Sequence, residues 1–322
     1  MENKFNFGLI LNSLLVLLAF ACSPAQAQTY PDRPIRIISI HPVGITTDLL
    51  ARALSQKLAD EIGQSVVVEN RPGANGVVAT NLVAKSPADG YTMLLTSSSH
   101  VANSLLNETI PYDLIQDFNP ITAICASYGL VLITNLPVKS VHELIEIGKK
   151  RPLSYATNGA GNTTHVAGLL LAKATGIEMN AVPYNSNSMI TDVMSGVVDF
   201  MFVGTVNADP LVKDGKVKAL ATTGPQRSKL MSDLPTFQEL GFKDFDVSGY
   251  FGLLFPAGTP ADRVEKIHAS VLKALKSKEL QTFMETSDYY TVASTPSQFK
   301  SFLQADYAQQ SRILQDLGLS KK

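Results

Sequence analysis

The sequence predicts an α/β protein of two lobes, each built on a mainly parallel sheet wound by helices. The order strand, polar turn, helix, strand, polar turn, helix, strand occurs twice along the chain. This alternation is typical of parallel sheets covered by helices. One apolar, strand-like segment follows each repeat, where it can cross between the lobes, and 322 residues is the length of about two domains.

The first repeat begins with a β-branched strand over residues 35–40. A polar turn leads to a helix over 49–61, whose leucines and alanines share one face, and then to a strand over 65–69. A glycine-rich turn precedes a helix over 77–85, and a second turn leads to a strand over 91–96. These elements form one complete wound unit.

The second repeat has the same order but little sequence identity with the first. Strands are expected over 153–156, 179–183 and 198–203, and helices over 165–175 and 189–195. The helix over 165–175 is apolar on nearly all sides, so we expect it to be buried. The repeat is therefore one of architecture rather than of sequence.

Two crossing strands are expected to join the lobes and to form a hinge. The first is the apolar run over 121–133 and the second covers 248–256. The tail is expected to complete the first lobe, because Thr259-Pro260 and Thr295-Pro296 have the cap-then-proline order that favours a helix start. The tail helices are expected over residues 261–276, 278–286 and 296–317.

Domain boundaries follow from these crossings. The first lobe is expected to be discontinuous and to consist of residues 28–126 and 251–322. The second lobe is expected to cover residues 127–250, and residues 1–27 precede both as a signal peptide.

The first 27 residues have the order of an export signal. An apolar run over Phe7–Ala21 is shorter than the roughly 20 residues that span a bilayer. Ala25-Gln26-Ala27 is the small-x-small pattern of a signal-peptidase site, so we expect cleavage after Ala27 and a periplasmic protein. Lipid attachment at Cys22 is the weaker alternative because the usual leucine is missing before it, and a buried N-terminal helix is another. Cleavage leaves Cys125 as the only cysteine.

The charge balance excludes some classes of partner. Only 17% of the residues are charged and the net charge is −1, so the chain lacks the basic excess of a nucleic-acid binder. Lysine and arginine are also not the obvious groups to meet a charged ligand. Neutral donors and helix N-termini are the alternative, because they present unpaired N–H groups and a partial positive charge.

Four polar turns follow predicted strands, at the sheet edges where open α/β sheets bind ligands. Each turn taken alone can also be read as ordinary helix capping, since Asp, Ser and Thr are common caps. The recurrence of such turns in both lobes favours a binding site. The candidate ligand-binding residues in these turns are Val43, Gly44, Ile45, Thr46, Thr47, Asp48, Ser97, Ser98, Ser99, Asn158, Gly161, Asn162, Thr163, Gly204, Thr205 and Asn207.

The sequence offers little for an enzyme. The glycine-rich run over 159–164 lacks the third glycine of a dinucleotide fingerprint and the Gly-Lys-Ser/Thr ending of a nucleotide loop. The five histidines have no metal-ligand spacing, His142-Glu143 has no second histidine, and no G-x-S-x-G elbow is present. We therefore expect no catalytic residue, metal or cofactor.

The mature chain resembles the Bug (TctC-type) receptors, the extracytoplasmic solute-binding proteins of tripartite tricarboxylate transporters. The motifs that carry the resemblance are spread over the whole mature chain in the same order. They include Tyr30-Pro31-Asp32-Arg33-Pro34, Glu69-Asn70-Arg71-Pro72-Gly73-Ala74, Ala88-Asp89-Gly90-Tyr91-Thr92, Val182-Pro183-Tyr184, Leu234-Pro235-Thr236, Pro256-Ala257-Gly258-Thr259-Pro260 and Thr295-Pro296-Ser297-Gln298-Phe299.

The resemblance implies a periplasmic-binding-protein (clamshell) fold that closes on a small organic carboxylate. It implies delivery of the ligand to membrane transporter subunits by a monomer without chemistry, and it adds His165 and Tyr184 to the candidate ligand-binding residues. A signalling receptor that meets a sensor when closed, or an exported hydrolase, stays an alternative.

Three departures from the family pattern bear on the ligand. Ile45 replaces a glycine, Asn185-Ser186 replaces a Lys-Gly pair, and Tyr250 stands where tryptophan is frequent. The first adds apolar bulk and the second removes a cation. We therefore expect a less highly charged ligand than citrate, such as an aromatic carboxylate or a longer dicarboxylate.

Overall fold

The computed structural model describes residues 30–73, 76–106, 110–159, 162–184 and 188–316. The chain divides into Met1–Asp32, of which only residues 30–32 are described, and Arg33–Lys322. All that follows concerns the second unit. The predicted signal over 1–27 and its cleavage site lie outside the described residues.

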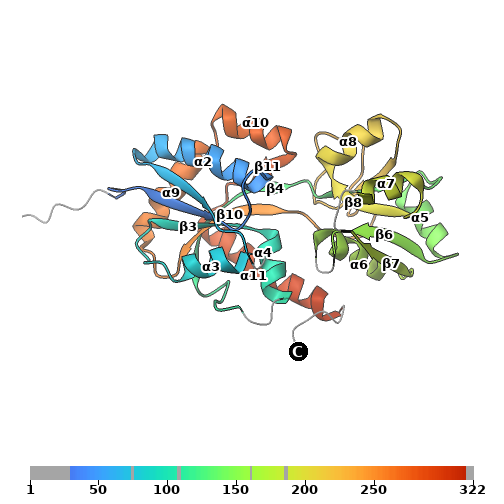
Figure 1. The fold of residues 1–322 in the computed structure, drawn as a ribbon, viewed down its shortest axis with the longest axis horizontal. Coiled ribbons are helices and arrows are strands. Elements are labelled where there is room, and N and C mark those ends of the chain that lie inside the picture. Colours follow the sequence, from blue (N-terminus) through green and yellow to red (C-terminus); the bar gives the residue numbers. More distant parts are fainter. Residues whose placement is uncertain (1–29, 74–75, 107–109, 160–161, 185–187, 317–322) are drawn as a thin grey trace, which may run out of the picture. The chain divides into compact units, whose positions relative to one another are not determined.

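Two sheets with helices on their faces make up this unit (Figure 1). The first sheet has six strands in the order β11-β4-β10-β3-β1-β2. Its strands are β1 (Ile35–Ser39), β2 (Val66–Asn70), β3 (Thr92–Ser97), β4 (Phe118–Ser127), β10 (Tyr250–Pro256) and β11 (Tyr289–Thr291).

The second sheet has five strands in the order β7-β6-β8-β5-β9. Its strands are β5 (Leu130–Thr134), β6 (Leu153–Thr157), β7 (Met179–Pro183), β8 (Phe200–Gly204) and β9 (Lys218–Thr222). Successive residues of β5 enter different cores, because side chains alternate across a strand. Leu132 packs in one hydrophobic cluster, and Val131 and Ile133 pack in another.

Ten helices occur in the described part of the chain. They are α2 (Thr46–Ile62), α3 (Val77–Ala84), α4 (Ser98–Leu106), α5 (Val141–Gly148), α6 (Thr163–Thr175), α7 (Ser188–Ser195), α8 (Thr205–Lys213), α9 (Ala261–Ala274), α10 (Lys278–Thr286) and α11 (Pro296–Asp316). The strands and helices predicted for both repeats and the tail are present, with ends shifted by a few residues.

The strands of each sheet run mainly in one direction, as predicted, and the exceptions are the crossing strands β5 and β10 together with β11. The strands of each repeat pair in parallel, as in β1 with β2 and β3, and β6 with β7 and β8. The remaining pairs are antiparallel. The physical reason is that β10 lies between β3 and β4, and β5 lies between β8 and β9. Each of these two strands enters from a crossing rather than through a helical crossover, and each runs opposite to both of its neighbours.

Two further expectations differ from the structure. The polar segments after the strands over 91–96 and 198–203 are not turns but the first residues of helices α4 and α8. Helix α6 is buried on one face only, through residues such as Ala167, Gly168 and Leu171. Val166 and Leu170 on another side are only partly buried and line cavities described below.

The first crossing is a tight passage from β4 to β5 through Tyr128 and Gly129. Gly129 has φ +93°, and a Cβ atom there would lie 2.3 Å from the backbone nitrogen of Gly224. Glycine is therefore required both by the backbone conformation and by the close approach of two chain segments. The second crossing enters β10 beside the first, since Ser127 and Gly249 exchange hydrogen bonds.

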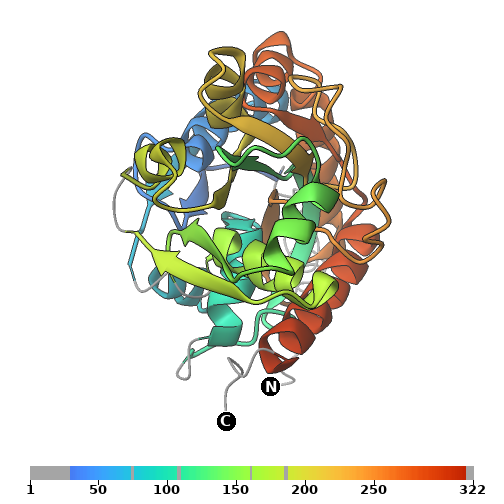
Figure 2. The ribbon, with the colours of Figure 1, turned by 90° about the vertical axis from the view of Figure 1, so that its right-hand side faces the viewer.

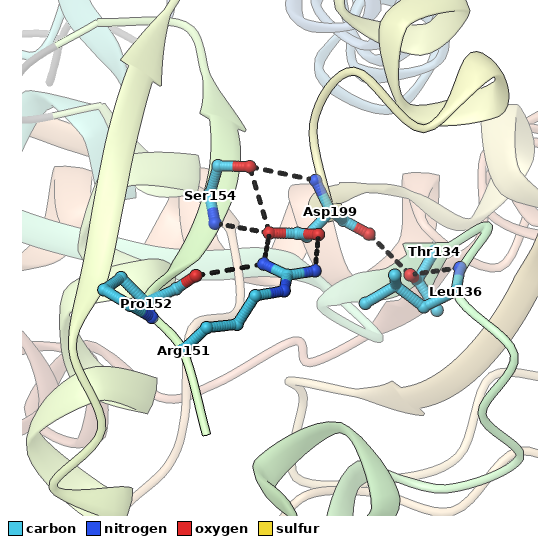
Figure 3. A network of polar contacts seen from close by, with 6 residues as sticks. All are labelled: Thr134, Leu136, Arg151, Pro152, Ser154 and Asp199. Carbon is cyan, nitrogen blue, oxygen red and sulfur yellow. Dashed lines mark hydrogen bonds and ion pairs between the residues drawn. The ribbon is translucent and has the colours of Figure 1, made fainter. Parts of the chain in front are cut away.

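One edge of the second sheet is held by a polar network around Asp199 (Figure 3). The carboxylate accepts a bidentate pair of hydrogen bonds from Arg151 at 2.6 and 2.8 Å, and another from the backbone N–H of Ser154 at 2.7 Å. Burial tends to raise the pKa of Asp199, but Arg151 and Ser154 outweigh it and the pKa is lowered. The hydroxyl of Thr134 donates to the backbone carbonyl of Asp199. Strands β5, β6 and β8 are thus joined to one another at the end of the sheet opposite to the starts of α6 and α8.

Candidate functional site

Four helices begin at one cleft between the two sheets. Their first residues are Thr46 of α2, Ser98 of α4, Thr163 of α6 and Thr205 of α8, and all four line a cavity of about 570 Å³. Each helix follows directly from a strand of its sheet, namely β1, β3, β6 or β8. Figure 2 shows the second sheet and its helices, coloured green to yellow, from the side that lies at the right in Figure 1. We call this cavity the cleft.

The helix starts give the cleft an excess of neutral donors. The N-cap residues of α2 and α8, Ile45 and Gly204, make no side-chain cap hydrogen bond. At α6 the N-cap Asn162 does cap, since its side-chain oxygen accepts from the backbone N–H of Thr164 at 3.3 Å. Unpaired N–H groups at a helix start carry a partial positive charge and attract anions.

Thr205 has a buried hydroxyl group that lacks a hydrogen-bond partner in the described part of the cleft. Its residue surface is only 3% exposed, and its hydroxyl oxygen has no hydrogen-bond partner among the described residues. A buried hydroxyl without a partner is costly, so such groups are normally paired. Because Thr205 lines the cleft at the start of α8, a bound acceptor would supply the missing partner.

The charge of the cleft is unusual for a site that attracts anions. The described residues that line it include no lysine, arginine or histidine. The single charged side chain among them is Asp288, which is 5% exposed and accepts a hydrogen bond from the hydroxyl of Ser228 at 2.8 Å. Asp288 has φ +58°, a left-handed conformation that is uncommon outside glycine. An acidic side chain is thus held at the cleft by a residue in the left-handed conformation.

The structure brings eight of the predicted site residues together at the cleft. They are Thr46, Ser98, Asn158, Asn162, Thr163, Gly204, Thr205 and Asn207. Eight others do not belong to the lining of the cleft, namely Val43, Gly44, Ile45, Thr47, Asp48, Ser97, His165 and Tyr184. Gly161 and the side chain of Ser99 lie outside the described part of the chain.

Asp48 shapes the first turn and does not reach the cleft. It is 1% exposed and accepts hydrogen bonds from the backbone N–H of Gly44 at 2.9 Å, Nε of Arg52 at 3.0 Å and Nδ2 of Asn70 at 2.9 Å. The bond from Arg52 is the main reason that the pKa of Asp48 is lowered. Thr47 is buried beside it, whereas Ile45 is 42% exposed and faces solvent.

The two residues added by resemblance have local partners. Tyr184 donates its hydroxyl proton to Asp192 at 2.7 Å, and this bond raises the pKa of Tyr184 to about 12. His165 stacks on the buried ring of Tyr155, with 6.4 Å between centroids. Ser97 lies within 3.3 Å of His41 Nε2 through its hydroxyl oxygen.

Sequence reasoning missed several cleft residues. Ser127, Gly129 and Leu130 come from the first crossing, and the prediction of a crossing at this place could have assigned them. Ser287, Asp288 and Tyr289 come from the tail, where strand β11 pairs with β4 through Tyr289 and Ser127. No local pattern in the sequence predicts this pairing between distant segments.

The histidines and acidic residues do not form a metal site in the part of the chain that the structure describes. No group of three or more His, Cys, Asp or Glu side chains there is arranged to hold a metal ion. His100 is fully buried among Thr80, Thr96 and Tyr112, and burial lowers its pKa to about 4. It is a neutral core histidine. None of the described helices combines the length and apolar character needed to span a membrane.

Comparison with known proteins identifies the family. The model of the tripartite tricarboxylate transporter family receptor matches residues 50–319. The chain belongs to this family. Among its relatives, BugT of Bordetella pertussis is 34% identical to the receptor over 317 residues, which covers 96% of this chain and 97% of BugT. The family is one of periplasmic solute-binding receptors rather than enzymes.

Solved structures confirm the two-lobed fold of the receptor. An R. palustris protein solved with adipate is 31% identical, with a TM-score of 0.73 over 90% of this chain and 99% of that one. MatC from Rhodopseudomonas palustris with bound malate is 26% identical, with a TM-score of 0.70 over 88% of this chain and 100% of that one. The predicted family and fold class are therefore both confirmed.

Proposed function

We propose that this receptor captures a small organic carboxylate at the four helix starts of the cleft and delivers it to the membrane subunits of a tripartite transporter. The observation that carries the proposal is the convergence of Thr46, Ser98, Thr163 and Thr205 on one cavity. The unpartnered hydroxyl of Thr205 adds an independent sign of a missing acceptor. Relatives solved with adipate and with malate support a carboxylate ligand.

The charge of the cleft argues for a ligand of low negative charge. A carboxylate at the helix starts is met by neutral donors, because the described lining offers no cationic side chain. A second or third carboxylate would share the site with Asp288 without a cation to compensate it. We therefore propose an aromatic or longer-chain carboxylate, including adipate-like dicarboxylates, in preference to citrate.

Closure of the two lobes about the crossing strands supplies the affinity. The ligand meets Thr46 and Ser98 from the first sheet, and Thr163 and Thr205 from the second. Closing the cleft excludes water and strengthens each of these hydrogen bonds, while the crossing strands absorb the rotation. No bond is made or broken in this cycle. The lobes are proposed to be residues 28–126 with 251–322, and residues 127–250.

The remaining parts of the proposal concern the mature protein. We place it in the periplasm as a monomer after cleavage behind Ala27, with lipid attachment at Cys22 as the alternative. The mass of the exported protein decides between the two, since lipidation would retain the six residues from Cys22 to Ala27 and add acyl chains. Light scattering of the purified protein tests the monomer.

A thermal-shift screen tests the function. Purified mature protein is heated with terephthalate, nicotinate, adipate or citrate, and the proposal expects stabilisation by at least one of the first three. Thr163→Phe fills the cleft and should abolish the shift. The control Thr282→Phe adds the same ring to an exposed position of α10 and should keep it. Tighter binding of citrate than of the other three refutes the low-charge class, and an unchanged shift in Thr163→Phe refutes the site.

A further inference from the structure

A second cavity of about 310 Å³ lies beside the cleft. Ser98, Thr163 and Val247 line both cavities, so the two share a wall at the starts of α4 and α6. We call it the side cavity. The side cavity therefore lies next to the helix starts that are proposed to hold the ligand.

The side cavity is mainly apolar. Val166 and Leu170 of α6 form one wall, and Phe302, Ile313 and Leu314 of α11 belong to the other. Phe302 is 46% exposed although it packs edge-on against the buried ring of Tyr250, with 4.9 Å between centroids. Covering such an exposed aromatic ring with an apolar chain is favourable at about 25 cal/mol per Å² of area removed from water.

Two carboxyl groups stand among these apolar side chains. Asp306 accepts hydrogen bonds from the hydroxyl of Tyr250 at 3.0 Å and from Nε2 of Gln310 at 2.7 Å. Asp246 accepts from the backbone N–H of Ser248 at 3.0 Å. Neither aspartate makes an ion pair with any residue that the structure describes.

The charge of one carboxyl group also affects the other. Burial raises the pKa of Asp306, and the charge of Asp246 raises it further. Burial is likewise the main cause of the raised pKa of Asp246. Two acidic groups that face a shared apolar space without a cation are unfavourable when both are charged. An ammonium group between them would relieve that cost, and a carboxylate there would add to it.

We propose that the side cavity binds the far end of a ligand whose carboxylate sits at the helix starts, and that this end is an amino group on an apolar spacer. This inference rests on the proposed carboxylate site and specifies the substrate class, an ω-amino carboxylate. Such a ligand is neutral overall, which matches a cleft without cationic side chains. Its apolar middle covers Phe302 and Leu170, and its ammonium group reaches Asp246 and Asp306.

Calorimetric titration of one matched series tests the inference. The ligands are hexanoate, 6-hydroxyhexanoate, adipate and 6-aminohexanoate, with the eight-carbon analogues for reach. The amino compound of the fitting length should bind at least tenfold more tightly than the unsubstituted acid of the same length, and the dicarboxylate should bind more weakly than the amino compound. Phe302→Ala should weaken all members of the series that have long spacers.

Charge-removing variants locate the effect. Asp306→Asn and Asp246→Asn should each cancel most of the gain from the amino group and leave binding of the unsubstituted acid within about twofold. The control Asp244→Asn removes the same charge from an exposed neighbouring position and should change neither. Two variants are used because Asp306→Asn also alters the bonds to Tyr250 and Gln310.

The outcomes separate this inference from the proposed function. If unsubstituted acids bind and Thr163→Phe abolishes their binding, but the amino end gives no gain, the side-cavity inference is wrong and the carboxylate site stands. The same holds if the gain persists in both aspartate variants. If no carboxylate of any length binds, the proposed function fails and this inference fails with it.

Discussion

Replacing Thr205 by valine should move stability and affinity in opposite directions. The hydroxyl of Thr205 is buried and has no partner among the described residues, and an unpaired buried polar group costs about 1–3 kcal/mol. Valine keeps the shape and removes this cost, so unliganded Thr205→Val should be more stable by about 1–2 kcal/mol. For a chain of this size that corresponds to a rise in Tm of roughly 2–4 °C per kcal/mol.

The effect on ligand binding has the other sign. A hydroxyl that donates to a carboxylate contributes about 1.5–3 kcal/mol, so the variant should bind its ligand about 10–100-fold more weakly. Differential scanning calorimetry and titration calorimetry measure the two quantities. Thr134→Val is the matched control, because the hydroxyl of Thr134 donates to the Asp199 carbonyl far along β5. It should lose stability and keep its affinity. A less stable Thr205→Val protein with unchanged affinity would refute the reasoning.

Three other predictions concern the hinge, the sheet and the cleft. Gly129→Ala should lower the free energy of unfolding, measured in urea, by more than about 2 kcal/mol, because the new Cβ would lie 2.3 Å from a backbone atom. The control Gly215→Ala, whose Cβ would have no atom within 4 Å, should lower it by about 1 kcal/mol. The hydrogen bond from Arg36 is the main cause that lowers the pKa of Glu69 to about 2, so Glu69 stabilises the fold above pH 4.5 and this is lost as the pH falls toward 2. Urea midpoints of Glu69→Gln should therefore fall less steeply over that range than those of the native protein. Asp288→Asn should tighten citrate binding more than nicotinate binding in titration calorimetry, and equal changes for both would count against a charge effect.

Much of the fold was predictable from the sequence because local signals are strong in it. Helix α10 matches its expected range, and α11 begins where Thr295-Pro296 indicates, with Thr295 and Gln298 exchanging capping hydrogen bonds. The β-branched strands of the two repeats were also clear. Helices α4 and α8 were missed, because a helix that starts with serine, threonine or glycine looks like a polar turn.

The candidate site was predictable only in part. Strand ends are local features, so the helix starts at Ser98, Thr163 and Thr205 could be placed at a ligand-binding edge. The remaining cleft residues depend on pairing between distant segments, as for Asp288, which reaches the cleft through the β11–β4 ladder. Asp48 has a structural role that a local pattern does not reveal, because its carboxylate accepts hydrogen bonds from Gly44 and Asn70 and so shapes the turn.

The described lining of the cleft has no cationic side chain, and this has a consequence for the medium in which the receptor works. Free charges attract an anion over a Debye length of about 8–10 Å at ordinary ionic strength, and added salt screens that attraction. Hydroxyl and N–H dipoles at Thr46, Ser98, Thr163 and Thr205 act at contact distance and are hardly screened. The affinity of the cleft should therefore vary little between dilute and saline surroundings, while capture proceeds by unsteered diffusion. Such a receptor associates with its ligand more slowly than one with electrostatic steering, but its affinity does not change with the salt concentration outside the cell.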